Sequence, residues 1–314
     1  MLIVDPIAAA GEALLERGAE LVRAPDSAPD TIRSLAAGCE GIITRSKLPD
    51  DVFDAAPRVR AVAIHGTGID LVPLEAATAR GVMVSNIPGG NAQSVAEYCV
   101  MAMLVLARNL LSISHSLKAT TWDAARALGA EAHELAAMTL GIVGVGAIGS
   151  RLARIARHGF RMRVLGTQRR LDRLPPEALP ADLETLLKAS DFVVLACPLT
   201  HETRYLLNRE TIGRMKQTAW LINVGRGPVV EEAALIEALR ERRIAGAMLD
   251  VYEHYRLEAG HALFSLDNVV LTPHLSGMTQ ESRARMSVAA AEEMLRMLAG
   301  ERPRNFVNPR LAQA

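Results

Sequence analysis

The 314-residue sequence predicts an α/β fold built on two parallel sheets. Short apolar segments alternate with helical patterns along the chain, which is typical of strands joined by helices in a parallel sheet. Hydrophobic residues make up 50% of the chain and aromatic residues only 4%, so Ala, Leu, Val and Ile must fill the core, as in sheets covered by helices on both faces. The alternation restarts at Thr139, and we therefore expect two domains.

The first domain begins with a short apolar strand and continues with helices and strands in turn. We expect strands at residues 2–4, 19–23, 41–44, 61–64 and 82–85, and helices at residues 11–17, 31–37 and 74–80. The turn at residues 86–91, which contains Pro88, Gly89 and Gly90, then interrupts the pattern, and a long helix begins near Ser94. This turn is the expected hinge between the domains.

The second domain has the stronger strand pattern. We expect six strands, at residues 140–143, 163–166, 192–196, 219–223, 247–251 and 269–272, and helices at residues 149–157, 182–189 and 231–240. The last helix, residues 280–299, is followed by a tail, residues 303–309, that we expect to return to the first domain. The predicted boundaries are residues 1–92 and 280–314 for a discontinuous first domain and residues 93–279 for a second domain inserted into it.

A glycine-rich loop follows the first strand of the second domain and precedes an Ala- and Leu-rich helix. The first glycine of such a loop permits the tight turn, the second lets the backbone approach a pyrophosphate, and the third lets helix and strand pack closely. The helix N-terminus presents N–H donors to the phosphate charge. A strand before, a helix after and a second strand at the expected distance distinguish this loop from an ordinary glycine-rich turn. We therefore expect a Rossmann-like domain whose dinucleotide-binding loop contains Gly144, Gly146, Ala147, Ile148 and Gly149.

The end of the next strand bears on which dinucleotide is bound. NAD-binding sites usually place Asp or Glu there, about 20 residues on, to accept hydrogen bonds from the ribose hydroxyls. Here the strand runs into Thr167, Gln168, Arg169 and Arg170, without a carboxylate. A hydroxyl and guanidinium groups suit a 2′-phosphate, which a carboxylate would repel. The segment therefore favours NADP(H); the alternative is that both arginines are solvated loop cations, which leaves NAD open.

Composition excludes several other classes of function. Lys+Arg and Asp+Glu number 35 each, so no overall field attracts nucleic acid or an anionic membrane. Cys39, Cys99 and Cys197 lie far apart and predict neither a metal site nor a disulfide framework, as expected for reduced thiols of a cytoplasmic protein. The N-terminus lacks the features of a signal peptide. The apolar segment 95–111 carries Glu97 and Arg108, and we interpret it as a buried core helix rather than a membrane span.

Seven short motifs occur in order along nearly the whole chain. They are Gly66-Thr-Gly-Ile-Asp70, Asn91-Ala-Gln-Ser-Val-Ala-Glu97, the glycine-rich loop, Pro198-Leu-Thr200, Ile222-Asn-Val-Gly-Arg-Gly227, Leu249-Asp-Val251 and Leu271-Thr-Pro-His274. This ordered set resembles the D-2-hydroxyacid dehydrogenase family, which includes phosphoglycerate, glyoxylate/hydroxypyruvate and formate dehydrogenases. The resemblance implies that the discontinuous domain is the substrate domain and that residues 93–279 are the dinucleotide-binding domain. It also implies an active site in the cleft between the two domains and a homodimer joined through the dinucleotide-binding domains. The segment from Thr167 to Arg169 resembles that of the NADP-preferring glyoxylate/hydroxypyruvate reductases.

The same resemblance assigns the chemistry of the site. It implies that Arg226 binds the substrate carboxylate with its planar two-pronged donor group and that His274 is the general acid/base, a role suited to an ordinary pKa of about 6.5. The backbone N–H groups of the Gly66-Thr67-Gly68 turn are expected to bind the carboxylate's other face, and the adjacent His65 is expected to line the pocket. Further cofactor contacts are expected from Cys197, Pro198, Thr203, Val224 and Asp250.

Tyr255 departs from the family pattern. Most members carry at this position a glutamate that orients the histidine and raises its pKa, and Glu253 and Glu258 are nearby but out of register. Three interpretations are open. Tyr255 orients His274 by a neutral hydrogen bond, one of the two nearby glutamates substitutes for the missing carboxylate, or activity is reduced or lost. We favour the first and count Tyr255 among the catalytic residues, because the arginine and histidine of the motifs are both retained.

The leading functional hypothesis is an NADP(H)-dependent, D-stereospecific reductase of a small 2-keto acid such as glyoxylate or hydroxypyruvate. One alternative is an NAD-dependent dehydrogenase of another 2-hydroxy acid. A second is a weakly active or non-catalytic dinucleotide-sensing protein, which the Tyr255 departure keeps open. Arg256, next to Tyr255, indicates either a second anionic group on the substrate or a surface ion pair. We expect no bound metal and no nucleic-acid or membrane partner.

Overall fold

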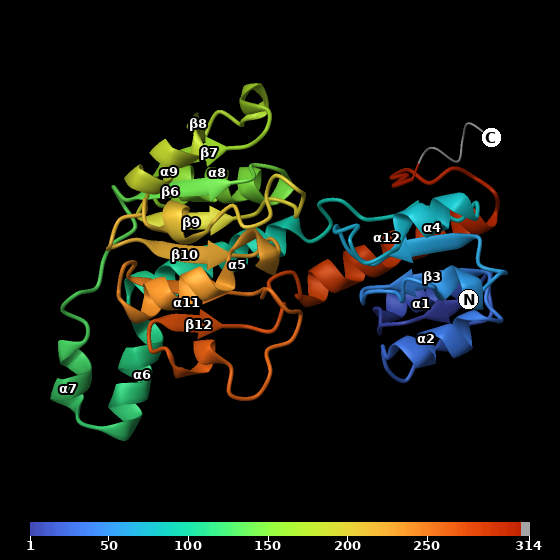
Figure 1. Cartoon of the computed structure of the whole chain (residues 1–314), viewed down its shortest axis with the longest axis horizontal. Helices are drawn as coiled ribbons and strands as arrows, with labels where there is room; N and C mark the ends of the chain where they lie inside the picture. Colours follow the sequence, from blue (N-terminus) through green and yellow to red (C-terminus); the bar gives the residue numbers. More distant parts are fainter. Residues whose placement is uncertain (309–314) are drawn as a thin grey trace. The chain divides into compact units, whose positions relative to one another are not determined.

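The computed structural model describes residues 1–308. The chain forms two compact units: unit 1 is Met1–Asn91 together with the segment that begins at Met278, and unit 2 is Ala92–Gly277. Each unit is a parallel β-sheet with helices packed against it (Figure 1). The prediction of an α/β fold with two parallel-sheet domains is confirmed.

Unit 1 has a five-stranded parallel sheet in the order β2-β1-β3-β4-β5. Every residue of β3 and β4 is buried, because α2–α4 pack on one face of the sheet and α1 and α12 on the other, so both strands read as continuous apolar runs. The strands are β1 (Leu2–Ile3), β2 (Val22–Arg23), β3 (Gly41–Thr44), β4 (Ala61–Ile64) and β5 (Met83–Ser85). The helices are α1 (Ala9–Leu15), α2 (Pro29–Ala36), α3 (Val52–Ala55), α4 (Leu74–Ala79) and α12 (Gln280–Leu298).

Helix α12 belongs to unit 1 although it follows unit 2 in the sequence. It buries Met286, Met294 and Met297 in the same core cluster as Ile3 of β1 and Ile43 of β3. Its approach to α1 requires Gly11, since a Cβ there would lie 2.7 Å from the backbone oxygen of Ser287. The tail after α12 also returns to unit 1, where the Val307 N–H donates to the backbone oxygen of Val84 in β5 at 2.9 Å. Residues 309–314 of the expected substrate domain lie outside the described residues.

Unit 2 has a seven-stranded parallel sheet in the order β12-β11-β10-β9-β6-β7-β8. This is the doubly wound arrangement of a Rossmann fold, with its switch point between β6 and β9. The strands are β6 (Thr139–Val143), β7 (Arg163–Thr167), β8 (Leu179–Pro180), β9 (Phe192–Leu195), β10 (Trp220–Asn223), β11 (Gly246–Leu249) and β12 (Val269–Leu271). The expected six strands are correct but β8 was missed, because its two residues are exposed at the sheet edge and leave no apolar pattern.

The helices of unit 2 are α5 (Ala92–Ala107), α6 (Leu110–Ala119), α7 (Trp122–Ala127), α8 (Ala147–Gly159), α9 (Leu183–Ala189), α10 (Arg209–Ile212) and α11 (Glu232–Arg240), with short 3₁₀ turns at Leu171–Arg173, Gly227–Val229 and Ala262–Ser265. The segment 95–111, expected to be one buried helix, is broken at Asn109, which adopts the left-handed conformation with φ of 47° that asparagine tolerates. Helix α5 is largely buried, whereas α6 buries none of its residues.

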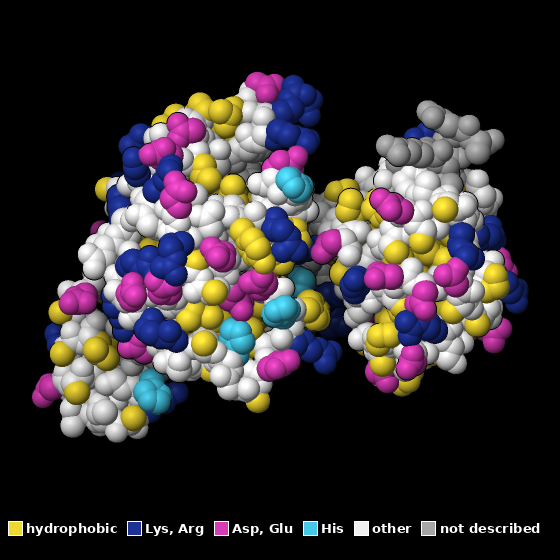
Figure 2. All heavy atoms as spheres, viewed as in Figure 1, with side chains coloured by type: hydrophobic (Ala, Val, Ile, Leu, Met, Phe, Trp, Pro, Cys, Tyr) yellow, Lys and Arg dark blue, Asp and Glu magenta, His cyan; other side chains and the backbone are white. Residues whose placement is uncertain are grey.

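Within residues 1–308 no single helix has the length and apolarity to cross a membrane. Helices α5 and α6 together have that length and apolarity, but they meet at a bend of 54°. On the visible face of each unit Lys and Arg side chains are interspersed with Asp and Glu (Figure 2).

Candidate active site

The carboxyl ends of the unit 2 strands bring most of the expected site residues to one edge of the sheet. The last residues of β6, β9, β10, β11 and β12 stand side by side in the hydrogen-bonding register. The residues that follow these strands therefore share the edge at which doubly wound sheets bind their ligands. In strand order they are Gly144, Cys197, Val224, Asp250 and Thr272.

The three glycines of the loop after β6 have different tasks. Gly144 has φ of +91°, and a Cβ there would lie 2.6 Å from the Cα of Cys197, so the turn itself requires glycine. A Cβ on Gly149 would lie 2.6 Å from the Gly144 oxygen. A Cβ on Gly146 would meet no protein atom within 4 Å apart from its chain neighbours. Packing therefore explains the first and third glycines, while the space at Gly146 fits the approach of a pyrophosphate to the N-terminus of α8, whose first turn has no acidic residue.

The segment after β7 distinguishes the two candidate arginines. Arg170 pairs with Asp172 at 2.9 Å, and its carbonyl oxygen accepts a hydrogen bond from the Gln168 side chain at 2.8 Å. Arg169 is exposed, and its charge helps to lower the pKa of Glu202, an effect whose main cause is the hydrogen bond from the Thr200 hydroxyl. Arg169 is therefore the stronger candidate for a 2′-phosphate, since the other guanidinium already has a carboxylate partner.

The loop after β9 faces the glycine loop across the switch point. Burial raises the pKa of the Cys197 thiol to about 11, which keeps it neutral. The Thr203 hydroxyl donates to the Pro198 oxygen at 2.7 Å and accepts from the Thr200 N–H at 2.7 Å. The Thr203 hydroxyl thus links two backbone groups of this loop, and Cys197 is buried beside Gly144. Val224, at the end of β10, is buried.

Arg226 extends from a rigid turn after β10. The Asn223 side chain accepts from the Gly225 N–H and donates to the Arg226 oxygen, both at 3.1 Å. Gly227 is required, because a Cβ there would lie 1.6 Å from the Tyr252 oxygen. The half-buried Arg226 guanidinium donates from Nη1 to the Gly225 oxygen at 2.9 Å. The role of Asn223 was not inferred from the sequence, although it stands inside one of the seven motifs.

His274 follows β12 in a conformation that is unusual for a residue with a side chain. Its φ is +54°, in the left-handed region, and its N–H donates to the Asp250 oxygen at 2.9 Å. The buried Asp250 carboxylate accepts from the Thr272 hydroxyl at 2.7 Å, the Leu275 N–H at 2.8 Å and the Ser276 N–H at 2.9 Å. Such a conformation persists only where its surroundings fix it, and Asp250 does so from both sides of His274.

Tyr255 contacts His274 through its ring. The two rings meet edge to face, with centroids 5.9 Å apart and planes at 74°, although Tyr255 is 67% exposed. Glu253 has other partners: Oε1 accepts from the Tyr205 hydroxyl, and Oε2 accepts from the Glu232 N–H at 3.4 Å. The geometry therefore favours Tyr255 over Glu253 as the residue that orients the imidazole. An aromatic edge restricts the ring without supplying the negative charge of a glutamate.

In unit 1 the Gly66-Thr67-Gly68 turn follows β4 and is tied to the segment after β5. The Ile87 N–H donates to the Gly66 oxygen at 2.8 Å, and the Thr67 hydroxyl donates to the Ile87 oxygen at 3.2 Å. The Asn86 side chain donates to the Thr67 oxygen at 2.7 Å. Two of these bonds use backbone oxygens of the turn as acceptors, the third uses the Thr67 hydroxyl as donor, and together they fix the shape of the turn.

His65 is buried in unit 1, and its Nε2 lies 2.9 Å from the hydroxyl of Ser287 on α12. The same hydroxyl accepts from the Ala8 N–H at 2.8 Å. Burial, assisted by the positive charge of Arg45, lowers the pKa of His65 to about 4. The imidazole is therefore neutral near pH 7 and has a structural partner.

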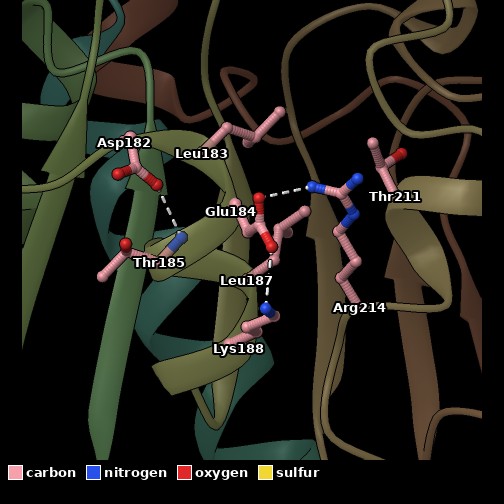
Figure 3. Close-up of a pocket in the computed structure, with 8 residues that line it drawn as sticks. All are labelled: Asp182, Leu183, Glu184, Thr185, Leu187, Lys188, Thr211 and Arg214. Carbon is pink, nitrogen blue, oxygen red and sulfur yellow. Dashed lines mark hydrogen bonds and ion pairs between the residues drawn. The ribbon is translucent and has the colours of Figure 1, made fainter.

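A pocket between α9 and α10 is a separate feature (Figure 3). None of the expected site residues lines it. Glu184 pairs there with Lys188 at 2.7 Å and with Arg214 at 2.8 Å. Glu184 therefore offsets part of the charge of both cations, and the fourth charged group, Asp182, accepts from the Thr185 N–H at 2.7 Å.

Comparison with known proteins identifies the relatives of this fold and site. The profile of the D-isomer specific 2-hydroxyacid dehydrogenase NAD binding domain matches residues 100–276. The glyoxylate reductase of Pyrococcus furiosus is 42% identical over 275 residues, which cover 83% of this chain and 80% of that protein. The NADPH-dependent glyoxylate/hydroxypyruvate reductase of Sinorhizobium meliloti, solved with NADP and malonate, is 28% identical with a TM-score of 0.85, covering 98% of this chain and 95% of that one. The NAD-dependent formate dehydrogenase of Staphylococcus aureus, solved with NAD, is 27% identical with a TM-score of 0.85 and covers 96% of both chains.

The matching profile and these relatives confirm the family resemblance inferred from the sequence. The chain belongs to the D-isomer-specific 2-hydroxyacid dehydrogenase family of NAD(P)-dependent oxidoreductases.

Proposed function

We propose that the chain is an NADP(H)-dependent reductase of a small 2-keto acid such as glyoxylate or hydroxypyruvate, and that it acts with D-stereospecificity. The observation that carries this proposal is the shared sheet edge of unit 2, where the open Gly146 loop, Arg226 and His274 follow strands β6, β10 and β12 of one parallel sheet. The glyoxylate reductase from Pyrococcus furiosus supports the choice of substrate. Retention of both Arg226 and His274 disfavours a non-catalytic sensing role.

In the proposed reaction the residues of the chain bind the acid and supply its proton. The Arg226 guanidinium binds the substrate carboxylate and draws electron density from the adjacent carbonyl. The reduced nicotinamide, when bound, supplies the hydride that reaches the carbonyl carbon. His274 holds the proton and transfers it to the carbonyl oxygen, while the Tyr255 ring restricts the imidazole.

The preference for NADP(H) rests on the end of β7, where Arg169 is exposed and no carboxylate is present. The Sinorhizobium relative is NADPH-dependent, whereas the Staphylococcus relative is NAD-dependent, so NAD is the second candidate. The matched test compares Arg169→Asp with Arg170→Asp, because only Arg170 pairs with Asp172. We expect the first variant to lower the NADPH-to-NADH ratio of kcat/KM about tenfold or more through loss of a charge-assisted contact, and the second to change it much less.

The decisive assay measures NADPH and NADH oxidation with glyoxylate, hydroxypyruvate and further 2-keto acids. We expect turnover with NADPH and a loss of about 10²- to 10⁴-fold in His274→Ala, the usual contribution of a general acid. Dinucleotide binding should persist in that variant. An absence of turnover with every acid, combined with normal dinucleotide binding, would overturn the proposed activity.

We also propose a homodimer joined through unit 2. Helices α5 and α6 expose an apolar groove that Met101, Leu104, Leu110 and Ile113 help to line. An exposed apolar groove is typical of a protein–protein interface, and the family resemblance implies a dimer. The groove therefore fits a second copy of the chain. Light scattering after size-exclusion chromatography tests the proposal.

A further inference from the structure

A chain of hydroxyl groups connects the buried helix α5 to the segment that carries His274. The Tyr98 hydroxyl lies 2.5 Å from the Thr272 hydroxyl, and the Thr272 hydroxyl donates to the Asp250 carboxylate at 2.7 Å. Tyr98 is only 7% exposed, and all of these residues belong to unit 2. Neither Tyr98 nor Thr272 was among the expected site residues.

The hydrogen bonds in this chain have one direction. A threonine hydroxyl has a single proton, and a carboxylate oxygen only accepts. Because the Thr272 proton is donated to Asp250, Tyr98 must be the donor to Thr272. Burial raises the pKa of the Tyr98 hydroxyl above its usual range, so this donor proton is retained across the working pH range.

Asp250, the last residue of this series of hydrogen bonds, contacts the backbone at His274 and just after it. The Asp250 carboxylate accepts from the Leu275 and Ser276 N–H groups, and the Asp250 backbone oxygen accepts from the His274 N–H. The φ of +54° at His274 depends on these contacts. A change in the orientation of the carboxylate would therefore move the backbone on which the imidazole is carried.

We propose that Tyr98 is a positioning residue of the reductase, which fixes the Thr272 hydroxyl and, through the Asp250 carboxylate, the backbone that presents His274. This inference rests on the proposed function of His274. It assigns to α5 a part in the site although α5 contributes none of the expected catalytic groups.

The kinetic test uses Tyr98→Phe, Thr272→Val, the double variant and the conservative Thr272→Ser. We expect kcat for glyoxylate reduction to fall about tenfold in Tyr98→Phe with the NADPH Kd unchanged, less than the roughly hundredfold loss from a misplacement of about 1 Å. The double variant should be no slower than Thr272→Val, because both substitutions break one path, and Thr272→Ser should retain near-normal kcat. Additive losses in the double variant, or an unchanged kcat in Tyr98→Phe, would overturn the inference.

A second measurement does not depend on activity. Amide hydrogen exchange at Leu275 and Ser276 should be at least about fivefold faster in Tyr98→Phe than in the wild type, while the Gly225 amide, bonded to Asn223, should not change. Ser190→Ala is the control, since it removes a buried hydroxyl that donates to Leu186 instead. A lower Tm in Tyr98→Phe with unchanged exchange at both amides would show a general structural role and overturn the inference.

The two measurements separate failure of this inference from failure of the proposed function. If the wild type reduces no 2-keto acid, the proposed function fails, and the exchange rates alone decide whether Tyr98 fixes the His274 backbone. If the wild type is active but both kcat and exchange are unchanged in Tyr98→Phe, the positioning role fails while the proposed function stands.

Discussion

Replacing His65 by glutamine should remove a specific part of the protein's sensitivity to acid. The His65 imidazole is 6% exposed, with its Nε2 2.9 Å from the Ser287 hydroxyl, and its pKa falls from 6.5 to about 4 mainly through burial. The unfolded chain therefore binds a proton at this residue more readily than the folded chain. Stability from the neutral imidazole is complete above pH 6.5 and is lost as the pH falls from there to about 4.

The size of the effect follows from the two pKa values. At about 1.4 kcal/mol per pKa unit, the gap between 6.5 and about 4 corresponds to a maximum of about 3 kcal/mol. About 2 kcal/mol of this is lost between roughly pH 8 and pH 5, because the unfolded state is almost fully protonated at the lower pH. Glutamine keeps a polar group near Ser287 but does not titrate, so the variant should lack this contribution.

The assay is urea unfolding at the two pH values, with the unfolding of unit 1 followed by pulsed hydrogen exchange of the peptide that contains β4. The pH-dependent loss of unfolding free energy should be about 2 kcal/mol smaller in His65→Gln than in the wild type. His115→Gln, at an exposed position in α6, is the matched control and should behave as the wild type. Equal losses in the wild type and His65→Gln would refute the reasoning, as would an NMR titration that placed the pKa of His65 near 6.5.

Three further experiments test other parts of the molecule. Gly146→Ala should keep the wild-type Tm but raise the NADPH Kd about tenfold or more, whereas Gly149→Ala should lower the Tm, because its Cβ would lie 2.6 Å from the Gly144 oxygen. Calorimetric titration measures the Kd and thermal unfolding measures the Tm. Normal NADPH binding by Gly146→Ala would contradict the role given to this glycine. Tyr255→Glu should move the decline of reductase activity to a pH about one unit higher, since a carboxylate stabilises the protonated His274, and an unmoved pH dependence of kcat/KM would exclude that explanation. Leu104→Glu should convert the proposed dimer to a monomer in light scattering, and an unchanged mass would place the interface elsewhere.

The strands of the sheets could be predicted closely where both of their faces are buried. Strands β3 and β4 have the bounds expected from the sequence, because every residue in them is buried and the apolar run ends within one residue of the strand end. The pattern fails where burial is incomplete. Strand β8 is exposed at an edge, and the apolar segment that ends at Leu111 continues past the break at Asn109, so the sequence alone indicated one buried helix where there are two helices.

The positions of the expected site residues of unit 2 could be predicted because these residues lie in loops that follow strands. Arg226 and His274 belong to short motifs, and the parallel sheet brings the ends of their strands to one edge. Their supports could not be found in this way. Tyr98 and Thr272 lie 174 positions apart in the sequence, and His65 and Ser287 lie 222 positions apart, so only the folded chain shows that they meet. A buried tyrosine on an apolar helix has the same pattern as any core residue.

The position of Tyr255 is determined by α11 more than by the contacts of Tyr255 itself. Glu232, in the first turn of α11, accepts from the Glu253 N–H at 3.2 Å and pairs with His261 at 3.2 Å, so one carboxylate anchors both ends of the segment that carries Tyr255. The Glu253 carboxylate could approach His274 only by leaving its bonds from the Tyr205 hydroxyl and the Glu232 N–H. A substitution at position 255 leaves both anchors intact, because Tyr255 is exposed and takes no part in them. Tyr255→Glu therefore tests the charge next to His274 without displacing the segment, which makes its pH dependence interpretable.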